Sequence, residues 1–220
     1  MDLTEPLARV GERIAAAGGD PDAVAVVAVT KGFGIEAVQA AARAGLVDIG
    51  ENYAAELAAK ATAARALGLE ARWHFLGRVQ RNKVRQIASD VSLWQGVDRL
   101  AAGGEIARRA PGAAVLVQVD VTGRPGRNGC GWDDAPALAD GLRALGLEVR
   151  GLMAVGPGGD PESARPGFRR LAALAAALGL PDVSMGMSDD LEVAVAEGAT
   201  MVRLGTALFG PRPQPEMVQG

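Results

Sequence analysis

Apolar positions recur along the chain in two alternating patterns. Short runs rich in β-branched residues, of which residues 24–31 are the first, predict strands that are buried on both faces. Between these runs lie alanine-rich segments with helical spacing, such as 35–44 and 54–67, and a glycine follows each of these two. The alternation predicts about eight strands, each followed by a helix, with one more helix at residues 3–14.

This order of elements predicts the fold class. Strands are predicted at residues 24–31, 46–49, 72–76, 91–94, 113–121, 147–153, 183–185 and 201–204. The later helices are predicted at 82–88, 100–109, 135–145, 168–178 and 189–197. Strict alternation favours a parallel sheet, and eight repeats fit a single-domain (β/α)8 TIM barrel over residues 1–220. An open doubly wound sheet is the alternative, but no glycine-rich phosphate fingerprint follows the first strand.

Composition narrows the class of protein further. Hydrophobic residues make up 49%, charged residues 22%, and the net charge is -3, with no basic tract, so no nucleic-acid partner is expected. No apolar run reaches the roughly 20 residues of a membrane span, and the first residues are unlike a signal peptide. One cysteine and one histidine predict no metal site and fit a reducing compartment. We therefore expect a cytoplasmic protein that acts as a monomer.

The carboxyl ends of barrel strands carry the active or binding site, so the residues there are the candidates. Lys31 ends the first strand, where burial would lower the pKa of its amine and make it a nucleophile for carbonyl groups. The alternative is a lysine whose charged tip reaches solvent. Asn52 follows the second strand and His74 lies in the third, so both are candidate binding residues.

Two segments near the end of the chain resemble an anion cradle. Met185 and Ser188 follow the seventh strand, and Gly205 and Thr206 follow the eighth, which is where barrels commonly bind phosphate. The alternative for Ser188 is an ordinary N-cap of the helix at 189–197.

Arg203 lies within the short buried strand at 201–204, where a charge needs a partner. One interpretation is an ion pair with Glu51 or Asp48. The other is an arginine that donates to a ring nitrogen of a bound ligand. An amine, a phosphate cradle and a ring-facing arginine together suggest pyridoxal 5′-phosphate, with its aldehyde on Lys31.

Several segments resemble the pyridoxal phosphate homeostasis proteins (YggS-like proteins). They are residues 27–31, 49–53, 73–77, 80–83, 151–153, 184–192 with MGMSDDLE, and 201–210 with VRLGTALFG. The resemblance implies a barrel like the N-terminal domain of alanine racemase, with the cofactor as an internal aldimine on Lys31. It implies a role in vitamin B6 and amino-acid homeostasis, with no catalytic residue and no robust turnover. Delivery of the cofactor to apo enzymes that depend on it is a further expectation.

The chain also departs from that family. It has Arg78, Val79 and Arg81 where the family usually has His, Leu and Ser, and Arg127 where the family has a lysine. An arginine cannot form a Schiff base, so transfer through a second lysine is not expected. The glycine-rich loops at 123–131 and 156–167, with the tail from Pro211, are expected to be mobile.

Two enzymatic alternatives remain open. A weak amino-acid racemase would use Lys31 on one face of the cofactor and Tyr53 or His74 on the other. Both residues have bland interpretations: Tyr53 as an aromatic at a helix start, and His74 as a core histidine with satisfied hydrogen bonds. A class I aldolase would use Lys31 for a substrate Schiff base, but the MGMSDDLE and VRLGTALFG segments argue against it.

Overall fold

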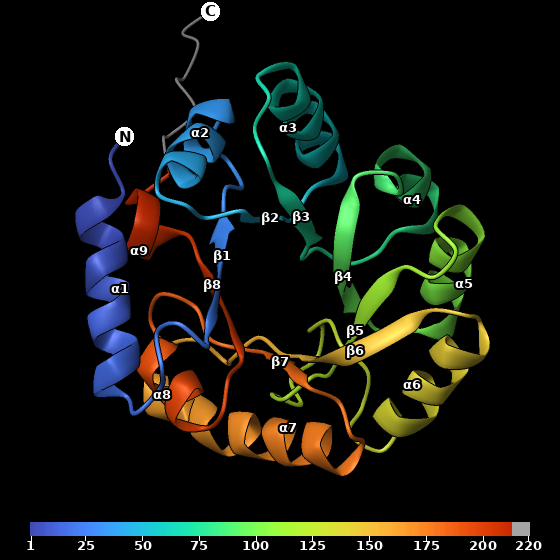
Figure 1. Cartoon of the computed structure of the whole chain (residues 1–220). Coiled ribbons are helices and arrows are strands. Elements are labelled where there is room, and N and C mark those ends of the chain that lie inside the picture. The colour runs from blue at the N-terminus through green and yellow to red at the C-terminus, as the bar shows by residue number, and fades with distance from the viewer. Residues whose placement is uncertain (213–220) are drawn as a thin grey trace, which may run out of the picture.

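Eight parallel strands close into a barrel with helices around it (Figure 1). The computed structural model describes residues 1–212. The strands pair in sequence order, and the last pairs with the first in parallel. They are Ala25–Val29 (β1), Asp48–Glu51 (β2), Arg72–Phe75 (β3), Val91–Val97 (β4), Ala114–Gln118 (β5), Glu148–Met153 (β6), Asp182–Ser184 (β7) and Met201–Leu204 (β8). The predicted (β/α)8 barrel is confirmed, and pairing of β8 with β1 excludes an open sheet.

The helices form the outer layer of the molecule. The first of them, α1, precedes the barrel and packs beside α8 and α9 (Figure 1). The helices are Thr4–Ala16 (α1), Ile35–Arg43 (α2), Ala54–Ala66 (α3), Arg81–Ile87 (α4), Leu100–Arg109 (α5), Ala135–Ala144 (α6), Arg165–Ala177 (α7), Leu191–Ala196 (α8) and Thr206–Phe209 (α9), with a 3₁₀ turn at Pro161–Ala164 (η1). None of the helices in residues 1–212 has the length and apolarity that crossing a membrane requires.

The elements near the barrel mouth differ most from the prediction. Helix α7 begins at Arg165 rather than 168, because Pro166 is compatible with a first helical turn and η1 leads into it. Helix α8 begins at Leu191 rather than 189. Helix α9 has four residues, too few for a periodic signal, and was not predicted. Strand β5 ends at Gln118, three residues before its predicted end.

Alternation of side chains decides what faces the barrel interior. One apolar cluster takes one residue from each of five strands, which places it inside the barrel: Val27, Leu93, Leu116, Met153 and Met201. The remaining buried apolar residues form a second cluster that includes the helices. Since successive side chains along a strand point to opposite faces, residues two positions from this inner set also point inward. Lys31, four positions after Val27, thus lies at the mouth on the inner side.

The predicted domain, residues 1–220, includes a stretch at 213–220 that lies outside the described residues.

Candidate functional site

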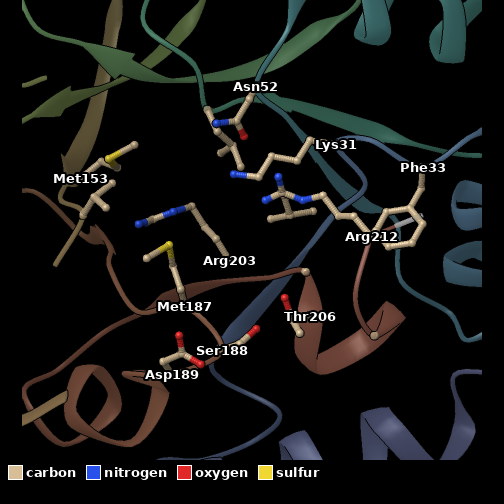
Figure 2. A pocket seen from close by; sticks show the side chains of 15 residues that line it. Lys31, Phe33, Asn52, Met153, Met187, Ser188, Asp189, Arg203, Thr206 and Arg212 are labelled. Atoms are coloured by element: carbon tan, nitrogen blue, oxygen red, sulfur yellow. The ribbon is translucent and has the colours of Figure 1, made fainter. Parts of the chain in front are cut away.

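A pocket of about 270 Å³ opens at the carboxyl ends of the strands (Figure 2). Its lining comes mainly from the ends of β1 and β8 and from the loop between β7 and α8. The lining residues are Val29, Lys31, Phe33, Asn52, Leu76, Met153, Val155, Met187, Ser188, Asp189, Arg203, Gly205, Thr206, Gly210 and Arg212.

Lys31 directs its amine into this pocket (Figure 2). The residue is half-buried, and this burial, with the cations of Arg212 and Arg203, lowers the pKa of the amine against an opposing effect of Glu51. The backbone turns directly after it, because Gly32 has φ +76°, in the left-handed region. A lowered pKa raises the fraction of neutral amine, which is the nucleophilic form. Partial burial with a lowered pKa favours the nucleophile interpretation of Lys31, and the role of this lysine stays a prediction.

A buried ion pair supports the chain directly before Lys31. The Nζ atom of Lys60 donates to Glu51 Oε1 at 2.5 Å and to the Thr30 carbonyl oxygen at 2.7 Å. The Thr30 hydroxyl donates to the same Glu51 oxygen at 2.5 Å. Glu51 is fully buried, and this burial raises the pKa of its carboxyl. The ion pair fixes the end of β1, which sequence reasoning missed because alanines surround Lys60 on a helix.

Arg203 reaches the pocket from within the barrel (Figure 2). It is 4% exposed, and burial lowers the pKa of its guanidinium to about 10. Its Nη1 donates to Ser184 Oγ at 2.7 Å and its Nη2 to the Ala154 carbonyl oxygen at 2.7 Å. A guanidinium has five N–H donors, so donors remain beyond these two hydrogen bonds.

The predicted alternative for Arg203, an ion pair with Glu51 or Asp48, is wrong. Glu51 pairs with Lys60, and Asp48 pairs with Arg72 and hydrogen-bonds to His74. Asp48 and Glu51 are three positions apart and so face opposite sides of β2, where Glu51 meets Lys60 of α3 and Asp48, at the start of the strand, meets Arg72.

Ser188 and Thr206 lie together at one side of the pocket (Figure 2), and Gly205, directly before Thr206, also lines it. The Ser188 hydroxyl oxygen accepts from the Ala207 backbone N–H at 3.0 Å, which ties the loop after β7 to the start of α9. Ser188 is not the N-cap of α8, because Asp190 occupies that position. Two hydroxyls beside a glycine fit an anionic group, since glycine permits close approach of the backbone.

Six of the eight predicted binding residues line the pocket, including Asn52 after β2. His74 does not: it is buried inside the barrel, with its ring nitrogens 3.0 Å from Asp48 Oδ1 and 2.8 Å from Gln95 Nε2. The interpretation of His74 as a core histidine with satisfied hydrogen bonds is thus confirmed. Met185 packs fully buried between the sheet and the helices.

Tyr53 lies at the start of α3, as predicted, but its ring is 62% exposed rather than packed. It does not line the pocket.

Sequence reasoning missed several lining residues. Arg212 brings a second guanidinium to the pocket from the tail that was expected to be mobile. Phe33, Met187 and Asp189 lie close to predicted residues in sequence, which was the available signal.

The two glycine-rich loops contact each other beside the pocket. Arg127 donates from Nη2 to the carbonyl oxygens of Gly156 and Pro157 at 3.1 Å each. Its side chain therefore links the loops at 123–131 and 156–167. Among residues 1–212, no group of three or more metal-ligating side chains is present.

The fold and the site define a class of barrel. Residues 7–213 match the family model of the alanine racemase N-terminal domain. An alanine racemase of Clostridium difficile 630 has the same fold, with a TM-score of 0.73 at 14% identity over 96% of this chain and 58% of that one.

Comparison with sequences and structures of higher identity gives the family. The "Pyridoxal phosphate homeostasis protein" of Pseudomonas aeruginosa is 42% identical over 96% of this chain and 94% of the relative. The protein of the same name from Escherichia coli K12 is 34% identical over 96% and 97%. The structure of PipY from Synechococcus elongatus PCC7942 with PLP bound has a TM-score of 0.79 at 32% identity, over 91% of this chain and 100% of that one. The chain belongs to the pyridoxal phosphate homeostasis protein family, as its motifs predicted.

Proposed function

We propose that this chain binds pyridoxal 5′-phosphate in the pocket described above and takes part in vitamin B6 and amino-acid homeostasis, without robust turnover. Lys31 would hold the aldehyde carbon, Ser188, Gly205 and Thr206 the phosphate, and Arg203 the ring nitrogen. Asn52 would contact the ring. The proposal includes a monomer in the cytoplasm, where one cysteine is compatible with reducing conditions.

The observation that carries the proposal is the meeting of Lys31 and Arg203 in one pocket (Figure 2). The residues present fit each part of the cofactor: a lysine amine of lowered pKa, hydroxyls beside a glycine, and a buried guanidinium with free donors. When bound, the cofactor supplies an aldehyde that condenses with a primary amine and gives a visible absorption band. Membership of this family and a solved relative with PLP bound support the same ligand.

The residues of this chain then act as holding groups. Lys31 provides the amine, and burial in the pocket lowers its pKa and so raises the fraction of the neutral form. Arg203 donates hydrogen bonds, and its high pKa makes it a poor source of protons for a ring nitrogen. A ring nitrogen that stays unprotonated withdraws electrons weakly, which is consistent with storage or delivery of the cofactor rather than with strong catalysis. The recipients would be apo enzymes that depend on the cofactor.

The test is a spectrum of the purified protein with the cofactor, before and after borohydride, followed by peptide mapping. The chain has three lysines, Lys31, Lys60 and Lys83, so the reduced adduct is easily assigned. We expect an absorption band at about 420 nm that is lost in Lys31→Ala. The band should be kept in Lys83→Ala, because Lys83 is exposed on α4.

An adduct on another lysine, or no uptake of the cofactor, would refute the proposal. Incubation of the cofactor-loaded protein with L-alanine or L-serine, followed by chiral chromatography, tests the claim that the protein has no robust turnover. Racemisation faster than about 1 per second would replace the homeostasis role with that of an enzyme.

A further inference from the structure

A chain of hydrogen bonds crosses the barrel interior and ends on Arg203. The guanidinium donates to Ser184 Oγ at 2.7 Å, and Ser184 Oγ donates to Gln95 Oε1 at 2.6 Å. Gln95 Nε2 is 2.8 Å from His74 Nδ1, and His74 Nε2 is 3.0 Å from Asp48 Oδ1. Asp48 is the first residue of β2, so the chain runs from the pocket to the opposite end of the barrel.

The donors of this chain all point the same way. Arginine has donors only, so Ser184 Oγ accepts from Arg203 and gives its own proton to Gln95. The Gln95 amide then accepts with oxygen and donates with nitrogen, which makes His74 Nδ1 an acceptor. His74 carries its proton on Nε2 and donates it to the Asp48 carboxylate. With the amide reversed, the Ser184 proton would have no acceptor, and a buried hydroxyl without one is costly.

This chain of hydrogen bonds orients the guanidinium of Arg203. Gln95 and Ser184 are fully buried and His74 is 4% exposed. In residues 1–212, Arg203 forms no ion pair with a carboxylate; its hydrogen-bond partners are the Ser184 hydroxyl and the Ala154 carbonyl oxygen. Ser184 in turn is oriented by Gln95, which does not line the pocket.

We infer that Gln95 is a positioning residue for ligand binding. Through Ser184, Gln95 holds the Arg203 guanidinium in the orientation that turns its remaining N–H groups toward the pocket. The identity of the ligand rests on the proposed function, whereas the hydrogen-bond chain can be tested in the cofactor-free protein.

The first test is nitrogen NMR of the cofactor-free protein. His74 is the single histidine of the chain, so its ring signals need no assignment. We expect the neutral tautomer with the proton on Nε2, and we expect Gln95→Leu and Ser184→Ala to shift the Nδ1 signal. The matched control is Gln118→Leu. Gln118 is a buried glutamine at the end of β5 that donates to the Asn128 carbonyl oxygen and takes no part in this chain of hydrogen bonds. A wild-type proton on Nδ1 overturns the inference.

The second test is binding of pyridoxal 5′-phosphate. We expect Gln95→Leu to bind about tenfold more weakly than Gln118→Leu, the effect of one charge-assisted hydrogen bond, with a displaced absorption maximum. Borohydride should still trap the cofactor on Lys31. Ser184→Ala should reproduce the loss and Ser184→Thr should restore binding, which keeps the test valid if Gln95→Leu does not fold.

The outcomes separate the two proposals. Equal affinity and equal spectra of Gln95→Leu and Gln118→Leu overturn the positioning role while the proposed function stands. If the wild-type protein takes up no cofactor, the proposed function fails. The His74 tautomer then tests the chain of hydrogen bonds by itself.

Discussion

Replacement of Lys60 by methionine tests how the end of β1 is held. Methionine keeps most of the volume and removes the ammonium group that contacts Glu51 and the Thr30 carbonyl oxygen. The Glu51 carboxylate would remain fully buried without its cation. Removal of one partner of a buried ion pair costs much more stability than the intact pair contributes, because the other charge stays unpaired in a medium of low dielectric constant.

The expected loss follows from this geometry. Breaking a buried pair destabilises a protein by about 3–5 kcal/mol, which for a chain of this length lowers the melting temperature by about 6–20 °C. Burial already raises the pKa of the Glu51 carboxyl. In the variant the folded state binds a proton at Glu51 more readily than the unfolded state, so stability falls as pH rises. The loss should therefore be larger at about pH 8 than at about pH 6.

Urea unfolding followed by circular dichroism measures this loss. Lys83→Met is the matched control, because Lys83 is exposed on α4 and forms no ion pair within residues 1–212, unlike Lys60. In the double variant Glu51→Gln with Lys60→Met, both charges are absent, and the total loss should be smaller than the sum of the single losses. A Lys60→Met loss no larger than that of Lys83→Met would refute the reasoning, as would additive losses in the double variant.

Three further predictions concern the pocket and its surroundings. Burial lowers the pKa of the Lys31 amine below its ordinary value of 10.5, so between these two values the unfolded chain binds more protons than the folded one. The free energy of unfolding of the apo protein, measured in urea, should therefore rise with pH in this window, and it should rise more steeply than in Lys31→Met. Burial raises the pKa of the Cys130 thiol to about 11, so iodoacetamide at about pH 8 should react more than about a hundredfold slower than with a free thiol, and a fast reaction contradicts this. Gly186→Ala should cost about 1–3 kcal/mol, because φ is +91° and the new Cβ would lie 2.5 Å from that of Ala194. Gly158→Ala, at φ +75° in open space, should cost less, and equal melting temperatures would contradict the steric argument.

The strand ends show how far local pattern reaches. Lys31 was predicted to lie at the site because a buried run ends there, and alternation along a strand is enough to place its side chain on the inner face, where it lines the pocket. Ser188, Gly205 and Thr206 were found because parallel strands bring their carboxyl ends to one face. These predictions needed only the order of elements and the chemistry of the residues.

Predictions about partners of buried charges were less successful. One of the two interpretations of Arg203 was an ion pair with Glu51 or Asp48, yet those carboxylates pair with Lys60 and Arg72. Such pairings depend on register between strands that are distant in sequence and on competition among several cations, and neither is written in a local pattern. Arg212 was missed for the same reason, since only the closed barrel brings residue 212 beside residue 31.

The sequence alone determined the class of fold and the family and placed Lys31 at a strand end, because hydrophobic period and short motifs are local properties of a chain. The role of Lys31 as the anchor stays a prediction. Only the tertiary structure decided that His74 and Met185 lie outside the pocket, and that Gln95 and Ser184 connect Arg203 to the far end of the barrel. The physical reason is closure: once β8 pairs with β1, inward side chains from five strands must satisfy one another's hydrogen bonds within one enclosed space.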